Sequence, residues 1–186
     1  QKISKATPTR STLPILSSVL FEVREEGVLL RSTDLEITII VKLHASIEKT
    51  GSSALPLQTL LNITSELPDK TRIQISSDLE NKVKISTDLG VYDIMAKPSE
   101  EFPNTPEVDN RKSIGISSDN LIDLIKKTLF AVSKDELKPA LTGVLFRFGE
   151  NELTGVSTDG HRLVRYIKND YKATEFKGDV IIPRKF

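Results

Sequence analysis

Apolar side chains recur at helical spacing in two stretches of the chain. Residues 55–67 contain Pro56 near their start, end before Pro68, and place four leucines on one face: Leu57, Leu60, Leu61 and Leu67. Residues 117–132 have apolar positions close to the helical period: Leu121, Ile122, Leu124, Ile125, Leu129 and Phe130. Ser118 is placed to cap this second stretch, and Lys126 and Lys127 lie toward the negative end of its dipole. The pattern therefore predicts two helices.

Short runs of alternating or apolar β character lie around these helices. The tripeptide Ser-Thr-Asp follows three of the runs, at residues 32–34, 86–88 and 157–159. Residues 72–95 read as strand, turn, strand, Ser-Thr-Asp and strand. Asp and Thr favour turns because their side chains hydrogen-bond to nearby backbone. The three tripeptides therefore predict three similar strand-to-strand turns.

The first and third tripeptides belong to a longer internal repeat. Residues 14–34 and 139–159 align without a gap, at an offset of 125 residues, and are identical at nine of 21 positions. A repeat of this kind indicates two copies of one domain. We expect each domain to consist of two half-units, each a helix followed by three antiparallel strands, which gives an α+β fold class.

A stretch with three prolines, residues 97–112, separates the two copies and is typical of a linker. We therefore expect one domain over residues 1–110 and the beginning of a second over residues 111–186. No Met opens the chain, and its first ten residues resemble the tail of a helix. We interpret the chain as an internal piece of a longer protein.

The amino-acid composition excludes several kinds of functional site. The chain has no Cys, which excludes disulfides, a thiol nucleophile and cysteine-ligated zinc. Lys and Arg together number 26, as do Asp and Glu, so any basic surface for nucleic acid must be local. No apolar run approaches the ~20 residues that a membrane-spanning helix needs.

Asp159 and His161 suggest a catalytic acid–base pair, but the repeat favours a structural role for the aspartate. Asp34 and Asp88 occupy the same place, and neither is followed by a histidine two residues later. A role common to all three copies must be structural. What is particular to the third copy is Gly160-His161-Arg162-Leu163, so a function of this site must lie in those residues.

Other signals of catalysis or cofactor binding are not found in the sequence. His44 and His161 are far apart and lack metal-ligand spacing, and there is no Gly-rich phosphate loop. We expect no cofactor and no metal. Arg162 is the strongest binding candidate, because a guanidinium can bind backbone carbonyls, carboxylates or phosphates. The alternative is an ordinary surface arginine.

Several motifs occur in the order and spacing of one known family: "RSTLPILSSVLFE", "STDLEI", "EFPN", "GVLFRF", "STDGHRL" and "IIPRK". On these motifs essentially the whole chain resembles the bacterial DNA polymerase III β subunit, the replicative sliding clamp. The resemblance implies a DNA-clamp fold of three domains per subunit, with antiparallel sheets outside and helices lining a ring. Residues 1–110 would be domain one without its first strand and most of its first helix. Residues 111–186 would be the first half of domain two, with domain three absent.

The resemblance implies a processivity factor rather than an enzyme: a non-catalytic subunit of the DNA polymerase III holoenzyme. Two full-length subunits would close into a homodimer ring around duplex DNA, without sequence preference and without a cofactor. The implied protein partners are the polymerase III catalytic subunit, the clamp loader, and other polymerases and repair proteins that carry a clamp-binding motif. The implied location is the bacterial cytoplasm, in association with the nucleoid and with no membrane partner.

The resemblance also implies functional residues. A partner segment similar to Gln-Leu-x-Leu-Phe would bind an apolar cleft that Arg162 and His161 edge and that Gly160 lets the backbone approach. The full implied pocket is Leu141, Thr158, Gly160, His161, Arg162 and Leu163. The implied DNA contacts are Arg10, Lys134 and Lys138, and the implied dimer interface is Ile63, Tyr92 and Ile94.

Two departures from the family concern DNA contact. Asp135 stands where the family often has a neutral DNA-contacting residue, and residues 57–67 are poor in Lys and Arg for a hole-lining helix. Plainer alternatives remain for the implied sites. The lysines can be solvated loop charges, and the interface residues can be ordinary core. Two other functions also stay open: an enzyme using Asp159 and His161, and a β-rich peptide-binding scaffold that does not encircle DNA.

Overall fold

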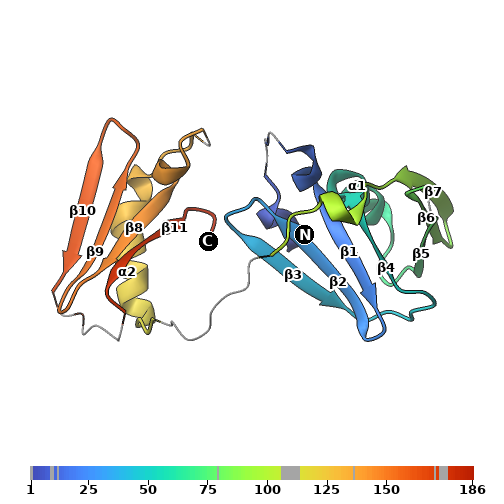
Figure 1. The fold of residues 1–186 in the computed structure, drawn as a ribbon, viewed down its shortest axis with the longest axis horizontal. Helices are drawn as coiled ribbons and strands as arrows, with labels where there is room; N and C mark the ends of the chain where they lie inside the picture. The colour runs from blue at the N-terminus through green and yellow to red at the C-terminus, as the bar shows by residue number, and fades with distance from the viewer. Residues whose placement is uncertain are drawn as a thin grey trace. The chain divides into compact units, whose positions relative to one another are not determined.

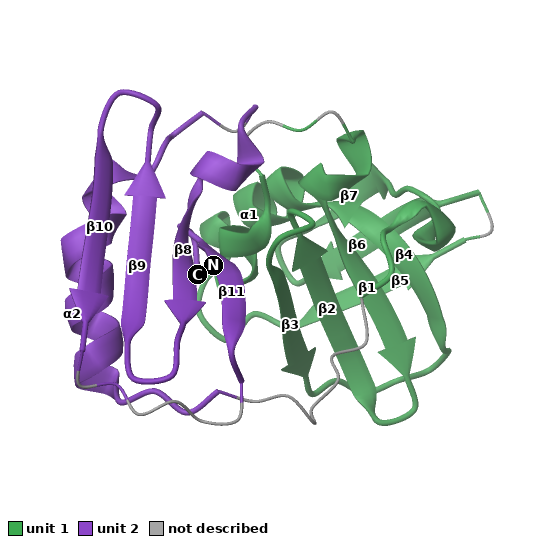
Figure 2. Ribbon diagram, turned by 60° about the vertical axis from the view of Figure 1, so that its left-hand side comes forward, with its two compact units in different colours: residues 1–105 green, residues 106–186 purple. Residues whose placement is uncertain are grey.

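The computed structural model describes residues 2–8, 11, 13–78, 80–105, 114–135, 137–169, 171 and 176–186. The chain forms two compact units, residues 1–105 and 106–186, which Figure 2 shows in green and purple. The expected domain boundary after residue 110 lies outside the described residues. Each unit has its own sheet and its own hydrophobic core.

Unit 1 contains a four-stranded and a three-stranded antiparallel sheet, in the strand orders β3-β2-β1-β4 and β5-β6-β7 (Figure 1). Its strands are β1 (Ser18–Arg24), β2 (Gly27–Thr33), β3 (Thr38–Leu43), β4 (Gly51–Pro56), β5 (Ile73–Ser77), β6 (Lys82–Thr87) and β7 (Gly90–Met95). Its helix is α1 (Leu57–Glu66), with short 3-10 helices η1 (Ile3–Ala6), η2 (Pro14–Ser17) and η3 (Ser99–Glu101).

Unit 2 repeats the first half of unit 1. Its sheet has the order β10-β9-β8-β11, which matches β3-β2-β1-β4 strand for strand. The strands are β8 (Gly143–Phe148), β9 (Leu153–Thr158), β10 (Leu163–Lys168) and β11 (Gly178–Pro183). The helix is α2 (Ser118–Thr128), with 3-10 helices η4 (Leu129–Ala131) and η5 (Pro139–Leu141). The internal repeat and the α+β class predicted from the sequence are therefore confirmed.

The predicted half-unit of three strands is incomplete, because β4 and β11 each add a fourth strand. β4 pairs with β1 from Gly51 to Pro56, and β11 pairs with β8 from Gly178 to Pro183. The sequence "GSSALP" has no apolar alternation, and its main contribution is backbone pairing along β1. The helix predicted from residue 55 accordingly begins two residues later, at Leu57.

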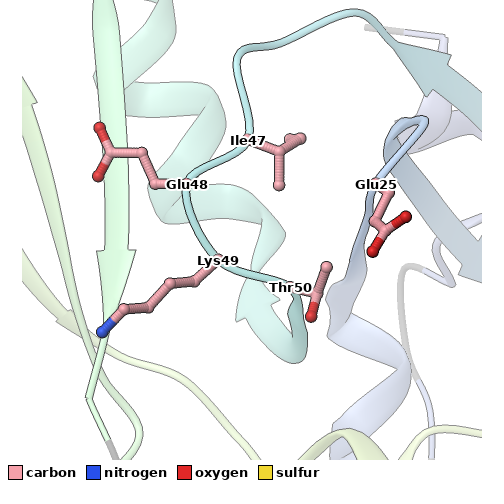
Figure 3. A pocket seen from close by; sticks show the side chains of 5 residues that line it. All are labelled: Glu25, Ile47, Glu48, Lys49 and Thr50. Carbon is pink, nitrogen blue, oxygen red and sulfur yellow. The ribbon is translucent and has the colours of Figure 1, made fainter.

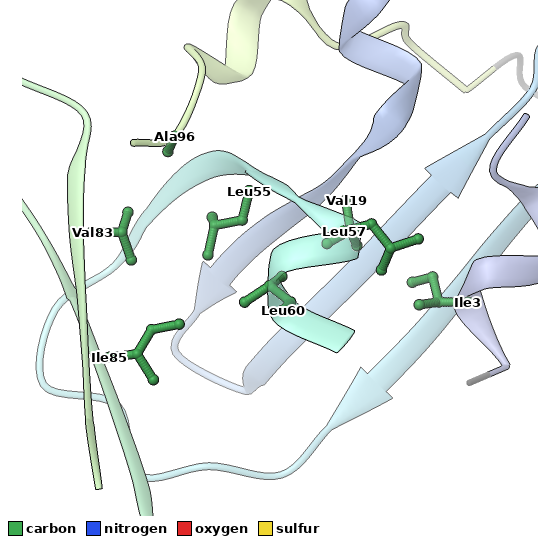
Figure 4. Packing of buried hydrophobic residues seen from close by; sticks show 8 residues of the cluster. All are labelled: Ile3, Val19, Leu55, Leu57, Leu60, Val83, Ile85 and Ala96. Atoms are coloured by element: carbon green, nitrogen blue, oxygen red, sulfur yellow. The ribbon is translucent and has the colours of Figure 1, made fainter. Parts of the chain in front are cut away.

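The core of unit 1 lies around α1. Figure 4 shows Leu57 and Leu60 of α1 between Val83 and Ile85 of β6 on one side and Val19 of β1 on the other. Along β6 the buried Val83 and Ile85 alternate with exposed residues, as a strand with one covered face requires. The helix therefore joins the two sheets of unit 1 into one core.

In unit 2, α2 packs closely on β9. Leu124 is fully buried, and a Cβ at Gly155 would lie 2.8 Å from its Cδ2 atom. The hydroxyl of Tyr166 on β10 donates a 2.5 Å hydrogen bond to Asp123 of α2. These contacts fix the helix against the middle and the edge of the sheet.

Several details of the predicted second helix differ in the structure. The N-cap is Ser117 rather than Ser118, since the Ser117 side chain accepts a hydrogen bond from the Asn120 N–H. The α-helix ends at Thr128 and continues as η4. Ile122 and Phe130 lie outside the buried face and are 47% and 58% exposed. Ile122 is two positions from Leu124, which places it on a different side of the helix.

No helix in the described part of the chain is long and apolar enough to cross a membrane.

Candidate functional site

The turn of residues 157–163 is built by its Ser-Thr-Asp tripeptide. The buried Ser157 hydroxyl donates a 2.6 Å hydrogen bond to the Thr128 carbonyl at the end of α2. The Thr158 hydroxyl donates to the Arg162 carbonyl and accepts from the Gly160 N–H. Asp159 Oδ1 accepts from the backbone N–H groups of His161 and Arg162 at 3.0 Å. Backbone and side chains together therefore fix the turn.

The first copy of the tripeptide makes the same contacts. Ser32 donates to the Ile3 carbonyl at 2.5 Å, and Asp34 Oδ1 accepts from the N–H groups of Glu36 and Ile37. Thr33 likewise bonds across its turn. The structural role predicted for the aspartate is thus confirmed in these two copies.

The middle copy differs, because only Asp88 and Leu89 separate β6 from β7. There Thr87 keeps its role, donating to the Gly90 carbonyl and accepting from the Leu89 N–H. The threonine role is therefore common to all three turns. The described hydrogen bonds of the aspartate are common to the first and third copies.

Gly160 is explained by its backbone conformation. Its φ is +91°, and the equivalent Leu35 also has a positive φ of 76°. In the described chain nothing lies within 4 Å of a Cβ added at Gly160, so close approach within the chain does not require this glycine. The glycine instead relieves the strain of a left-handed residue in an otherwise identical turn.

Arg162 joins the turn to η4. Its Nη2 donates to the Phe130 carbonyl at 2.7 Å, and its Nε donates to Asp159 Oδ2 at 3.0 Å. The guanidinium carbon also lies 5.7 Å from the centroid of the Phe130 ring. Arg162 thus holds an exposed aromatic ring beside the turn, a contact that the sequence did not predict because Phe130 follows the helical apolar pattern.

The acid–base alternative finds no support in this geometry. Asp159 contacts the backbone of His161, and the imidazole is not among its partners in the described structure. The backbone N–H groups of Arg162 and His161 hold the pKa of Asp159 below its ordinary value of 3.8. The carboxylate is therefore a stable acceptor rather than a proton-transfer group.

The turn presents apolar side chains next to polar ones. Leu163 is 66% exposed at the start of β10, and Leu141, in η5, is half-buried. His161 and Arg162, which directly precede Leu163 in the chain, are exposed. An exposed apolar surface edged by a guanidinium and an imidazole can take the apolar side chains of a short peptide.

The residues implied to contact DNA are only partly described. Arg10 lies outside the described residues. Lys134 is exposed, and Lys138 Nζ lies 4.0 Å from Asp135 Oδ2. Asp135 also accepts a hydrogen bond from the Leu137 N–H, so it orders this loop and offsets one of its charges.

The residues implied to form a subunit interface contribute to the core of unit 1. Ile63 of α1 and Tyr92 and Ile94 of β7 are partly buried and pack against the first core cluster. β7 is an edge strand of its sheet. These three residues thus contribute to the core, which was the alternative interpretation. Their role in a subunit interface stays a prediction.

A shallow depression elsewhere in unit 1 does not form a convergent site. It is lined by Glu25, Ile47, Glu48, Lys49 and Thr50, and Figure 3 shows Glu48 and Lys49 pointing away from Glu25. No group of three or more potential metal-ligating side chains occurs in the part of the chain that the structure describes.

Two family models match the chain in succession. The DNA polymerase III beta subunit N-terminal domain matches residues 1–106, and the central domain of the same subunit matches residues 115–186. The chain belongs to the DNA polymerase III beta subunit family. The chain spans about half the length of the curated relatives that it matches, which are named beta sliding clamps.

Individual relatives agree with this family membership. The beta sliding clamp of Staphylococcus aureus is 33% identical over 190 residues, which covers 97% of this chain and 50% of the relative. The crystal structure of the DNA polymerase sliding clamp from Bacillus subtilis is 28% identical, with a TM-score of 0.79, and the match covers 100% of this chain and 50% of that one. A sliding clamp from Pseudomonas aeruginosa bound to griselimycin is 29% identical, with a TM-score of 0.74 over 98% of this chain and 50% of that one. The clamp-type fold implied by the resemblance is confirmed.

Proposed function

We propose that this chain is part of a sliding clamp, a non-catalytic processivity factor that encircles duplex DNA and tethers a polymerase to it. The observation that carries the proposal is the succession of two beta-subunit domain matches along the chain. Residues 1–110 then serve as the first clamp domain and residues 111–186 as part of the second. Two full-length subunits close the ring, in the bacterial cytoplasm and on the nucleoid.

Encirclement explains how a neutral chain can hold DNA. A closed ring retains DNA by topology, so individual phosphate contacts can be few and weak. Contacts of Arg10, Lys134 and Lys138 with phosphates carry no sequence information and weaken as salt rises. The ion pair of Lys138 with Asp135 reduces the attraction further, which suits sliding.

The turn of residues 157–163 supplies the docking surface for partners. Leu141, Thr158 and Leu163 offer apolar contact to the leucine and phenylalanine of a clamp-binding peptide. Arg162 and His161 contribute polar groups at the edge of the same surface. Because Asp159 and the Phe130 carbonyl already orient Arg162, little side-chain entropy is lost when a peptide binds. The partners include the polymerase III catalytic subunit, the clamp loader, and other polymerases and repair proteins with the motif.

The subunit interface uses Ile63, Tyr92 and Ile94. Their side chains are partly buried against the core, and β7 has a free edge in the three-stranded sheet. A free strand edge with apolar neighbours can pair with a strand of another subunit. This arrangement supports closure of the ring through unit 1.

Peptide binding tests the docking surface directly. A fluorescently labelled Gln-Leu-Ser-Leu-Phe peptide is titrated with the full-length gene product, and anisotropy is followed. Leu163→Ala should weaken binding about tenfold, because it removes an exposed anchor contact. Arg162→Ala should also weaken binding. Ile167→Ala is the matched control, since Ile167 is an exposed apolar residue on the same strand, β10. Equal affinities for all these proteins would refute this surface as the docking site.

A further inference from the structure

Residues 97–105, here called the strap, follow β7 and are attached to unit 1 at few points. Ala96, just before the strap, still belongs to the main core of unit 1. Lys97 then pairs with Ala54 of β4 through two backbone hydrogen bonds of 2.8 and 3.0 Å, which form an isolated bridge rather than a strand ladder. Within the strap, Phe102 alone is buried, with 5% of its surface exposed. The strap therefore has one backbone bridge and one buried anchor.

The anchor Phe102 packs on the face of the four-stranded sheet that is opposite to α1. Its cluster contains Leu20, which follows Val19 of the main core along β1, and successive side chains of a strand point to opposite faces. The cluster also contains Ile15, Leu16 and Ala54. Because this small cluster is separate from the main core, Phe102 can leave it without opening the contacts around α1.

Arg31 of β2 holds the far end of the strap. Its Nη1 donates to the Thr105 hydroxyl at 2.7 Å, and its guanidinium carbon lies 5.9 Å from the centroid of the Phe102 ring. Its Nη2 also lies 3.3 Å from Glu22 Oε2 on β1, and this ion pair orients the guanidinium on the same face of the sheet. One side chain thus contacts the strap at two residues.

The internal repeat indicates that the sheet itself does not need an arginine at this position. In unit 2, Val156 of β9 pairs with Leu145, as Arg31 pairs with Leu20 in unit 1. A β-branched side chain suits a strand well. Arg31 Nε is also buried without a hydrogen-bond partner in the described chain, and such a donor costs stability. The arginine is therefore explained by its contacts with the strap rather than by strand pairing.

We propose that the strap is releasable as one piece and that Arg31 is its latch. With the latch closed, the chain leaves unit 1 at Thr105. With the latch open, the chain leaves unit 1 after Ala96, and the connection to unit 2 gains roughly 30 Å of reach when the strap is fully extended. Release also lets water reach the guanidinium and its unpaired Nε, which offsets part of the lost contacts. This device belongs to unit 1 and does not rest on the proposed clamp function.

Hydrogen exchange tests the strap, because the backbone N–H groups of Lys97 and Ala54 donate across the bridge. Exchange in the full-length gene product is followed by mass spectrometry with fragmentation to single residues. Arg31→Val should raise the exchange rate of both amides by about tenfold or more, since a hydrogen bond to a charged group contributes at least the free energy of a tenfold change in an equilibrium. The amides of β6, in the middle of the three-stranded sheet, should keep their rates.

Two further variants separate the latch from general stability. Thr105→Val removes the hydroxyl that Arg31 binds and leaves the sheet unchanged, so it should raise exchange at the same two amides by a smaller factor. Arg24→Gln is the matched control and should leave exchange unchanged, because Arg24 also lies 3.3 Å from Glu22 but its side chain is 57% exposed. The proposal is overturned if Arg31→Val and Thr105→Val leave the bridge amides unchanged, if the β6 amides accelerate equally, or if Arg24→Gln acts like Arg31→Val.

Discussion

At the scale of single residues, the three turns show which parts of a repeated tripeptide are structural. The sequence predicted the turn role of Thr and Asp, because these side chains bond to nearby backbone. It did not predict that Ser32 would donate to the Ile3 carbonyl in η1, or that Ser157 would donate to the Thr128 carbonyl at the end of α2. That contact joins residues 29 positions apart and has no local signal. Similarly, Phe130 matched the helical pattern, and only the structure shows it beside Arg162.

Asp159 leads to a prediction about pH. Its pKa is lowered in the folded chain by the N–H groups of Arg162 and His161, so its carboxylate stabilises the fold above the unfolded pKa of about 3.9. This stabilisation is lost as pH falls through the lower, folded pKa. Asp159→Asn should therefore reduce the free energy of unfolding of unit 2 at pH 7. It should also make that free energy differ less between neutral and strongly acidic solution. Urea unfolding of unit 2 at several pH values measures both effects.

The exposed Asp69→Asn provides the control for this titration. If Asp159→Asn and Asp69→Asn show the same dependence of the urea midpoint on pH, the hydrogen bonds to Asp159 do not stabilise the turn.

At the scale of elements, the sequence predicted the helices and strands that have a clear hydrophobic period. It missed strands whose position depends on pairing with a neighbouring strand. The helix containing Leu121, Leu124 and Ile125 was predicted because its apolar residues follow the helical spacing. β4 was missed because its residues 51–53 are Gly-Ser-Ser, and its position depends on the register with β1. Its counterpart β11 was likewise not predicted as the fourth strand of a sheet, since its position depends on the register with β8.

Close packing of α2 on β9 gives a prediction at this scale. Gly155→Ala would place a Cβ 2.8 Å from Leu124 Cδ2 and 3.1 Å from Thr128 Cγ2, so the buried Leu124 side chain, or the helix that carries it, has to move. We expect a loss of about 1–3 kcal/mol in the free energy of unfolding of unit 2. Chemical denaturation followed by circular dichroism measures the change.

Gly90→Ala is the matched control, because nothing lies within 4 Å of a Cβ at that strand position. A Gly155→Ala variant as stable as Gly90→Ala would mean that the helix accommodates the methyl group without cost, contrary to the packing seen between α2 and β9.

At the scale of the whole molecule, the repeat was visible in the sequence because the two copies share a buried strand pair and its turns. What the sequence could not reveal is which distant segment packs on the first copy: Phe102 is buried in one cluster with Leu16 and Leu20. Leu16 and Leu141 occupy equivalent positions, yet Leu16 is 2% exposed in the Phe102 cluster and Leu141 is only partly buried. A burial difference between identical residues depends on the rest of the chain and not on the repeat itself.

The proposed ring leads to a prediction about DNA retention. A full-length subunit loaded on a nicked circular plasmid should remain bound in salt that removes ordinary phosphate contacts, because the ring has to open before it can leave. Cutting the plasmid once should release the protein at least about tenfold faster, since it can then slide off an end. Gel filtration of labelled protein with DNA before and after cleavage measures the two lifetimes.

Lys138→Ala should change the salt dependence of binding slightly and leave the difference in lifetime between circular and linear DNA intact. Equal lifetimes on the two DNAs would show that surface contacts hold the protein, and would favour a peptide-binding scaffold that does not encircle DNA.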